Sequence, residues 1–536
     1  MPFLRALLLV LTVATLHSPS FAQGTIEGAV VSATNGQLLP RATVYLRNVK
    51  KRTDVSSSRA DGHAHFVFQG IDEGTYEITA ERQGFFYDSR RGPLQAPIDV
   101  QDGAHIKGIV VRLLPFAAVT GRIVDDYEDP IERAQVRLLA VQYFRGHPTL
   151  NNIGTAFTDD RGEYRISGVR PGNYYVVAEF DPYRNRRNNF GTDVKSQQPE
   201  LAFPPLFYPA TSDVRQAQRL PVAAGAEVYV KFAFVSVPSV SIEGRVVNGM
   251  TGELIKKPAI VVYWGDMRGG ITRRVELSEN GSFKVEGVSP GPFTLVTSAT
   301  EDEINYSDVR VVEVGATGLK DLEIPVMPDF DIKGQVRLDA VNNQRDIPRF
   351  AVEFAHMEKG SNIFRVNADK PRFEFSSKLH PGDHYKVSVP NLPEDYYLKS
   401  VLVSGHEAPN ADVAIYGPHA EMELVVSPTG GHIDGKALNS KGEPVSSYIL
   451  LTPDVDRVPS ESIRFTRSDT KGKFVLRGIP PGSYRLYALE DVDTNELINQ
   501  PDLLKSFENE AQLVRIEEGG KYELEVKPAA AVAVGP

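Results

Sequence analysis

Residues 160–174 read DRGEYRISGVRPGNY, and similar stretches recur as NGSFKVEGVSPGPF at 280–293 and KGKFVLRGIPPGSY at 471–484. Each contains a glycine, an aromatic residue two positions later, a second glycine, and a Pro-Gly pair followed by another aromatic residue. Looser copies begin at Asp61 and, without the first glycine, at Phe373. The motif positions are Gly162, Tyr164, Gly168, Pro171, Gly172 and Tyr174; Gly281, Phe283, Gly287, Pro290, Gly291 and Phe293; and Gly472, Phe474, Gly478, Pro481, Gly482 and Tyr484.

The glycines and prolines of this motif determine the backbone conformation of its turns. A glycine in the place of Gly162 suits the left-handed position of a short hairpin loop. The Pro-Gly pair predicts a type II turn, because proline fixes φ at one turn position and glycine accepts a positive φ at the next. Between the two turns, aromatic and aliphatic residues alternate with period two, which is typical of a strand with one face in a core.

A second feature precedes each copy of the motif: a short alternating strand with a glycine inside it. These glycines recur every 90 to 123 residues, at Gly28, Gly121, Gly244, Gly334 and Gly435. A proline follows each strand, and proline belongs at the start or edge of the next strand because it cannot donate to the ladder. A period of this size predicts an all-β chain of about five small sandwich domains.

The spacing divides the chain into five repeats, numbered here in chain order. The expected boundaries are a signal peptide at 1–22, repeat one at 23–115, repeat two at 116–238 with a long insert at 181–220, repeat three at 239–328, a divergent repeat four at 329–428, repeat five at 429–528 with a short helical insert, and a tail at 529–536.

With these residues in hand, the chain resembles the bacterial carboxypeptidase regulatory-like domain family. The strand glycine, the delayed proline and the Gly-x-aromatic…Pro-Gly-x-Tyr run carry the resemblance, which covers all repeats well except the fourth. It implies tandem seven-stranded β-sandwiches of the transthyretin-like type, grouped with immunoglobulin-like and carbohydrate-binding-like folds. It implies a fold more than a function, because function resides in sites on a shared scaffold.

The first residues are typical of a secretory signal. Arg5 supplies a positive start, Ala6 to Leu16 is apolar, and small residues flank a predicted cleavage before Gln23. The apolar run is too short to span a bilayer. We therefore expect an exported protein of the periplasm, cell surface or medium, with no membrane span after cleavage.

Composition excludes several classes of protein. At 536 residues the chain is too long for one hydrophobic core. A formal net charge of −10 argues against nucleic-acid binding, and the absence of cysteine excludes disulfides and thiolate chemistry. We find no zinc-peptidase, nucleophile-elbow or phosphate-loop motif. The sequence therefore predicts no enzyme, no cofactor and no metal site, although the acidic run from Asp125 to Asp129 could serve either calcium or a turn.

Aromatic side chains are the candidate ligand contacts, because sugar rings pack on aromatic faces. Trp264 is the single tryptophan, and the further candidates are Phe207, Tyr208, Tyr143 and Phe144. The alternative for all of them is packing in a core or between domains.

The leading hypothesis is an exported, non-catalytic binding or structural protein of the cell envelope, with polysaccharide or other envelope or secreted proteins as partners. Carbohydrate binding is its specific form. One alternative is an accessory module of a separate secreted hydrolase. Another is a cryptic hydrolase in repeat four, where Glu374, Asp383 and His384 lie near one another in sequence.

Overall fold

The computed structural model describes most of the chain after the expected signal peptide. The described residues are 23–49, 51, 55–88, 98–144, 147–182, 201–265, 272, 275–278, 281–339, 349–357, 363–455, 463–469, 471–489, 497 and 501–529. The expected signal peptide, part of the expected insert in repeat two and most of the expected tail lie outside them. The chain forms two compact units, residues 1–115 and 116–536, which are described separately below.

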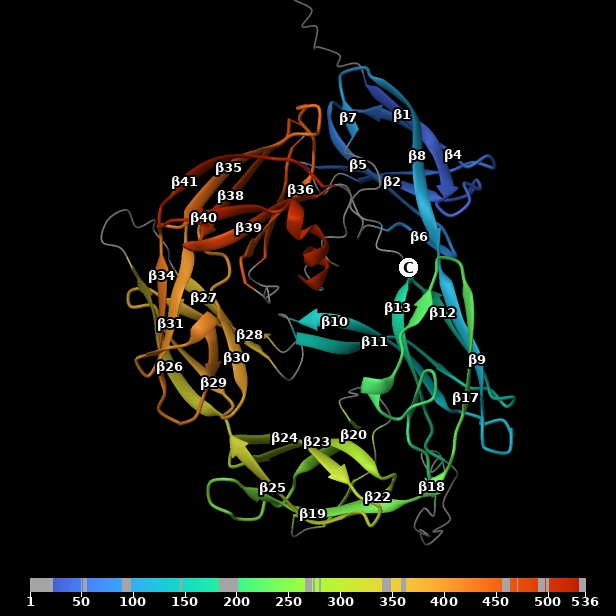
Figure 1. Ribbon diagram of the computed structural model, residues 1–536, viewed down its shortest axis with the longest axis vertical. Helices are drawn as coiled ribbons and strands as arrows, with labels where there is room; N and C mark the ends of the chain where they lie inside the picture. The colour runs from blue at the N-terminus through green and yellow to red at the C-terminus, as the bar shows by residue number, and fades with distance from the viewer. Residues whose placement is uncertain are drawn as a thin grey trace, which may run out of the picture. The chain divides into compact units, whose positions relative to one another are not determined.

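The first unit corresponds to repeat one and is drawn in blue in Figure 1. Its strands are β1 (Gly24–Ser32), β2 (Thr43–Asn48), β3 (Val55–Arg59), β4 (His65–Ile71), β5 (Gly74–Glu81), β6 (Phe85–Phe86), β7 (Ile98–Val100) and β8 (His105–Pro115). They form two four-stranded sheets, β4-β1-β8-β6 and β3-β2-β5-β7. Alternate residues of β1 are buried, as expected for a sheet with one face on a core.

The second unit contains repeats two to five. Repeat two has β9 (Ala117–Val124), β10 (Gln135–Phe144), β11 (His147–Phe157), β12 (Glu163–Val169), β13 (Gly172–Glu179), β14 (Leu201–Ala202), β15 (Leu206–Phe207), η2 (Val214–Gln216), β16 (Leu220–Val222), β17 (Glu227–Ala233) and β18 (Val237–Pro238). Repeat three has β19 (Val240–Asn248), β20 (Ala259–Trp264), β21 (Val275–Leu277), β22 (Ser282–Val288), β23 (Gly291–Glu301), β24 (Ile304–Val314) and β25 (Leu319–Pro328).

Repeats four and five complete this unit. Repeat four has β26 (Phe330–Leu338), β27 (Arg349–His356), β28 (Ile363–Asp369), β29 (Glu374–Leu379), β30 (His384–Ser388), β31 (Tyr397–Val403), β32 (His406–Glu407), η3 (Pro409–Ala411), β33 (Asp412–Ala414) and β34 (Glu421–Ser427). Repeat five has β35 (Gly431–Ala437), β36 (Tyr448–Pro453), β37 (Arg464–Arg467), β38 (Lys473–Ile479), β39 (Gly482–Leu489), η5 (Pro501–Glu510), β40 (Gln512–Ile516) and β41 (Lys521–Val526).

One strand arrangement recurs in all five repeats, the divergent fourth included. The strand that carries the early glycine pairs antiparallel with the strand of the motif and parallel with the last long strand of the repeat. The triplets are β4-β1-β8, β12-β9-β17, β22-β19-β25, β29-β26-β34 and β38-β35-β41. The chain is therefore an all-β array of sandwiches, as the sequence predicted.

The early glycine faces an aromatic ring across the sheet. A Cβ on Gly435 would lie 2.0 Å from Cζ of Phe474, and one on Gly334 would lie 2.3 Å from Cζ of Phe375. The same pairing of glycine and aromatic residue occurs in every repeat, as Gly28–Phe66, Gly121–Tyr164, Gly244–Phe283, Gly334–Phe375 and Gly435–Phe474. In repeats four and five the ring occupies the space of a side chain at this glycine. In repeats one, two and three the nearest atom to that space is a backbone carbonyl oxygen of the parallel strand, from Ile109, Val230 or Leu322.

The Pro-Gly pair does not make the predicted type II turn in repeats two and five. Gly172 and Gly482 have φ of 159° and 158°, far from the roughly +80° that this turn needs. The left-handed residue is instead the second motif glycine, with φ of 72° at Gly168 and 64° at Gly478. At Gly168 the ladder between β12 and β9 is irregular, which places a β-bulge before the turn.

Hydrophobic clusters follow the repeats, with one exception that matters below. The core of repeat three also contains Leu139, Val177 and Phe207 from repeat two. The helical insert of repeat five is the 3-10 helix η5, whose Leu504 and Phe507 are buried in a separate cluster beside β36 and β39.

Candidate ligand-binding cleft

Trp264, the first of the aromatic candidates, lies inside the protein. Its side chain is 8% exposed and packs edge-on against Phe293, with ring centroids 5.1 Å apart. Its indole Nε1 donates a 3.3 Å hydrogen bond to the carbonyl of Ser212 in the insert of repeat two. The motif glycine Gly291 makes room for the ring, since a Cβ there would lie 2.4 Å from it. In this arrangement Trp264 offers no ring face to a sugar.

Of the other aromatic candidates, the structure describes the side chains of Phe207 and Tyr208, and neither is exposed. Phe207 is 1% exposed and pairs with Val177 through β15 and β13. Tyr208 is half-buried against the core of repeat two. Tyr143 and Phe144 lie in β10, and their side chains are outside the described part of the structure.

The residues of the cryptic-hydrolase hypothesis each have a different partner. His356 is joined to Asp383 by a buried contact of 2.6 Å between Nε2 and Oδ2. His384 lies 3.6 Å from Asp412, and Glu374 pairs with Arg372. Among the described residues, Glu374, Asp383 and His384 thus have separate local partners and are not joined to one another by any of these contacts.

The acidic run that could serve calcium forms a turn. Oδ1 of Asp125 accepts hydrogen bonds from the backbone N–H groups of Tyr127 and Asp129, both at 2.9 Å. Within the described ranges no group of three or more His, Cys, Asp or Glu side chains is arranged to hold a metal ion.

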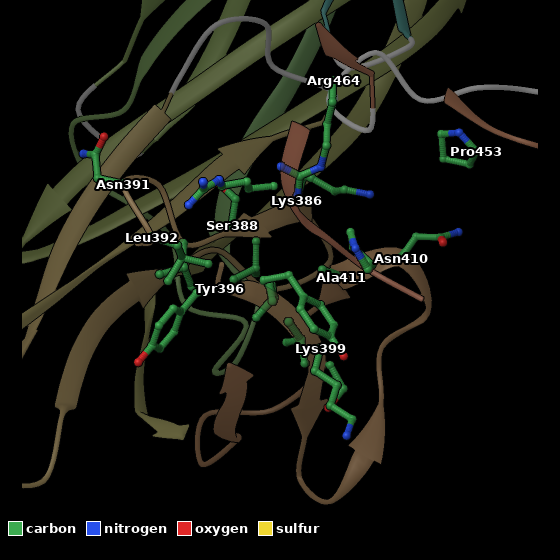
Figure 2. Close-up of a pocket in the computed structure, with 18 of the residues that line it drawn as sticks. Lys386, Ser388, Asn391, Leu392, Tyr396, Lys399, Asn410, Ala411, Pro453 and Arg464 are labelled. Atoms are coloured by element: carbon green, nitrogen blue, oxygen red, sulfur yellow. The ribbon is translucent and has the colours of Figure 1, made fainter. Parts of the chain in front are cut away.

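A cleft of about 1350 Å³ lies where repeat four meets repeat five, and the sequence reasoning missed it. Figure 2 shows β30, β31 and the loops around η3 on one side, with Pro453 and Arg464 of repeat five on the other. The lining mixes tyrosine, proline and aliphatic side chains with amide, hydroxyl and cationic groups. This mixture is what a site for a polar ligand with apolar faces requires.

Two asparagines place their amides at the rim of this cleft. Asn391 and Asn410 have φ of 57° and 54°, a left-handed conformation that asparagine tolerates better than most residues. Both side chains are exposed, and neither amide hydrogen-bonds to another described residue. They are available to a ligand as paired donors and acceptors.

Two of the four cationic residues that line the cleft, Lys399 and Arg477, are ion-paired with carboxylates. Nζ of Lys399 lies 2.5 Å from Oδ2 of Asp339, and in Figure 2 its side chain runs away from Arg464. Nη1 of Arg477 lies 3.1 Å from Oε2 of Glu394. Arg464 differs, because its partly buried guanidinium makes no ion pair or hydrogen bond with any residue that the structure describes.

A tight joint between the two repeats positions the cleft. Gly478 is so close to repeat four that a Cβ there would lie 2.6 Å from the carbonyl oxygen of Tyr396. Oε1 of Glu518 in repeat five accepts a 3.3 Å hydrogen bond from Oγ of Ser427 in repeat four. Sequence reasoning could not find this site, because its lining residues run from Lys386 to Tyr484 and belong to two repeats.

Among the residues described, no helix has both the length and the apolar character needed to cross a membrane.

Curated relatives share low identity over long stretches. Colossin-A of Dictyostelium discoideum is 19% identical over 523 residues, which is 84% of this chain and 4% of that protein. The BOS complex subunit NOMO1 of Mus musculus is 23% identical over 307 residues, 55% of this chain and 21% of that protein. The chain thus spans about a fifth or less of the length of these relatives.

Solved structures that align with the chain include the streptococcal ancillary pilin, at 14% identity and a TM-score of 0.19, covering 57% of this chain and 99% of that one. Two B repeat units of the collagen binding protein of Staphylococcus aureus align at 12% identity and a TM-score of 0.13, covering 75% of this chain and 99% of that one.

A family model matches residues 118–202, which run from β9 through the motif of repeat two to β14. The match contains Gly121, Gly162 and the Pro171–Gly172 pair, the residues on which the resemblance was recognised. Residues 118–202 therefore match the carboxypeptidase regulatory-like domain family, within an all-β chain that repeats the same strand arrangement.

Proposed function

We propose that the chain is an exported, non-catalytic binding protein of the cell envelope whose ligand is a carbohydrate. The observation that carries this proposal is the cleft at the joint of repeats four and five, with its mixed lining of tyrosines, amides and hydroxyls. Its size exceeds the roughly 300–1,000 Å³ of ordinary small-molecule pockets and suits an oligomer. The repeated scaffold supports a binding role. The motif residues of each repeat serve the fold, so the loops between the strands are available for recognition.

The test is a glycan array probed with the mature chain, residues 23–536. We expect saturable binding that is lost in Ser388→Trp, because Ser388 lies on β30 inside the cleft and an indole there would fill it. The matched control is Ser56→Trp, at an exposed position on β3 of repeat one, which should bind like the wild type.

Melting curves of both variants establish that they are folded. A blank array, or equal binding by wild type and Ser388→Trp, would contradict the proposal. A blank array together with co-purification of a secreted hydrolase would favour the accessory role instead.

A further inference from the structure

Two strand arginines of the second unit, Arg137 and Arg464, are removed from water to different degrees, and their surroundings differ. Arg137 in β10 is 1% exposed, and its Nε donates to Oε2 of Glu179 at 2.7 Å. That pair follows the general rule that a cation removed from water has a carboxylate beside it. Arg464 in β37 breaks the rule.

The ladder places Arg464 on the core side of its sheet. Its cross-strand partner in β36 is Leu451, which is fully buried in the core of repeat five. Directly opposite residues of an antiparallel pair point to the same face, so Arg464 occupies an inward position at the open end of the sandwich. Burial lowers the pKa of its guanidinium.

A guanidinium in this place stays protonated, since arginine does not lose its proton in proteins. Its charge is therefore partly desolvated, and no described carboxylate compensates for it. In Figure 2 the side chain reaches from β37 toward Lys386 and Ser388, into the space that these residues line. An anion bound in this space would give the guanidinium a partner that the described residues do not provide.

We propose that the cleft binds an acidic oligosaccharide whose carboxylate pairs with Arg464. The inference rests on the proposed function and adds the charge of the ligand. A carboxylate fits because the planar guanidinium donates two parallel hydrogen bonds to it. Lys399 and Arg477 already have carboxylate partners, so a ligand with sparse negative charge matches the cleft better than a densely charged one. The amides of Asn391 and Asn410 are placed to bind sugar hydroxyls.

The experiment is calorimetric titration of residues 23–536 with trimers of galacturonate, glucuronate and mannuronate, each beside its methyl ester. The ester keeps the ring and removes the charge. We expect at least one acid to bind, its ester to bind at least about tenfold more weakly, and Arg464→Gln to weaken the acid by on the order of tenfold to a hundredfold. Arg464→Lys keeps the charge but loses the planar guanidinium, so its affinity for the acid should lie between those of the wild type and Arg464→Gln.

The matched control is Arg467→Gln on the same strand. Arg467 is exposed, its guanidinium lies 5.1 Å from the ring centroid of Tyr448, and it does not line the cleft. This variant should bind like the wild type. Melting curves of Arg464→Gln and Arg464→Lys establish that both are folded.

Equal affinity for acid and ester, or unchanged affinity in both Arg464 variants, would overturn the inference. So would Arg464-dependent binding of a triglutamate peptide with no binding of the uronates. Binding of neutral glycans that both variants retain would leave the proposed function standing and remove only the acidic ligand. Failure of every saccharide would remove both.

Discussion

Single carboxylates hold the hairpin loops on which the repeats depend. Oδ1 of Asp159 accepts hydrogen bonds from the backbone N–H groups of Glu163 at 2.8 Å and Arg161 at 3.0 Å. Asp61 and Asp469 do the same in repeats one and five. The sequence reading recognised Gly162, whose φ is 73°, but not the acceptor three residues before it. A side chain that bonds to backbone leaves no hydrophobic period by which it could be found.

These bonds predict a pH dependence of stability in repeat two. The backbone N–H of Glu163 holds the pKa of Asp159 below its ordinary value. A carboxyl with a lowered pKa in the folded state contributes stability above the unfolded pKa of about 3.9, and this contribution disappears as the pH falls. In Asp159→Asn the amide oxygen accepts the same bonds without titrating. We expect its melting temperature to fall less than that of the wild type between pH 6 and pH 3.

The control for this experiment is Asp160→Asn. Asp160 is exposed beside Asp159 and makes no hydrogen bond with a described residue, so its replacement removes one charge at the same place. It should follow the pH profile of the wild type. Superimposable profiles for Asp159→Asn and wild type would show that the loop bonds do not depend on the charge.

At the scale of the element, one bulge serves two purposes. The second motif glycine is left-handed in repeats two and five, but its surroundings differ. Nothing lies within 4 Å of the space that a Cβ would occupy on Gly168, whereas a Cβ on Gly478 would meet the carbonyl oxygens of Tyr396 and Glu394 at 2.6 and 2.7 Å. The bulge at Gly168 in repeat two has open space beside it, whereas the bulge at Gly478 in repeat five contacts repeat four. The motif predicts the bulge, but the contact across repeats has no sequence signal.

The pair Gly168→Ala and Gly478→Ala separates these two effects. Both variants carry the cost of a left-handed alanine, about 1–2 kcal/mol. Only Gly478→Ala also pushes repeat five away from repeat four. We expect amides of residues 392–400 to exchange faster in Gly478→Ala, as measured by hydrogen exchange and mass spectrometry, and to be unchanged in Gly168→Ala. Unchanged exchange in both variants would mean that the contact does not hold the joint.

At the scale of the molecule, the sequence predicts the repeats but not the contacts between them. The all-β array was predicted from the spacing of Gly28, Gly121, Gly244, Gly334 and Gly435. This was possible because each of these glycines pairs across the sheet with an aromatic residue of its own repeat. The joints depend instead on particular pairs such as Trp264 with Ser212 and Arg477 with Glu394, which join residues 52 and 83 positions apart. Such pairs do not recur from repeat to repeat. A repeat period cannot predict such pairs, and the cleft that Arg477 and Glu394 help to line was missed for the same reason.

Repeats two and three share a hydrophobic core, so a substitution in one repeat should affect the other. Trp264 packs with Phe293 in repeat three and donates to Ser212 in repeat two, and Phe207 of repeat two belongs to the same cluster. Trp264→Ala should therefore destabilise repeat three by about 3–5 kcal/mol and also expose the neighbouring insert. We expect faster hydrogen exchange over residues 205–222 as well as over β20 and β23.

Two comparisons decide whether Trp264 acts as a joint. Tyr263→Ala changes the adjacent side chain on the other face of β20, and it should leave residues 205–222 protected. Because Trp264 is the single tryptophan, its fluorescence in the wild type reports this place alone. If repeats two and three unfold together, the fluorescence transition will coincide with the loss of protection in both. A separate, earlier loss of protection in the insert would show that the two repeats are independent domains whose cores merely touch.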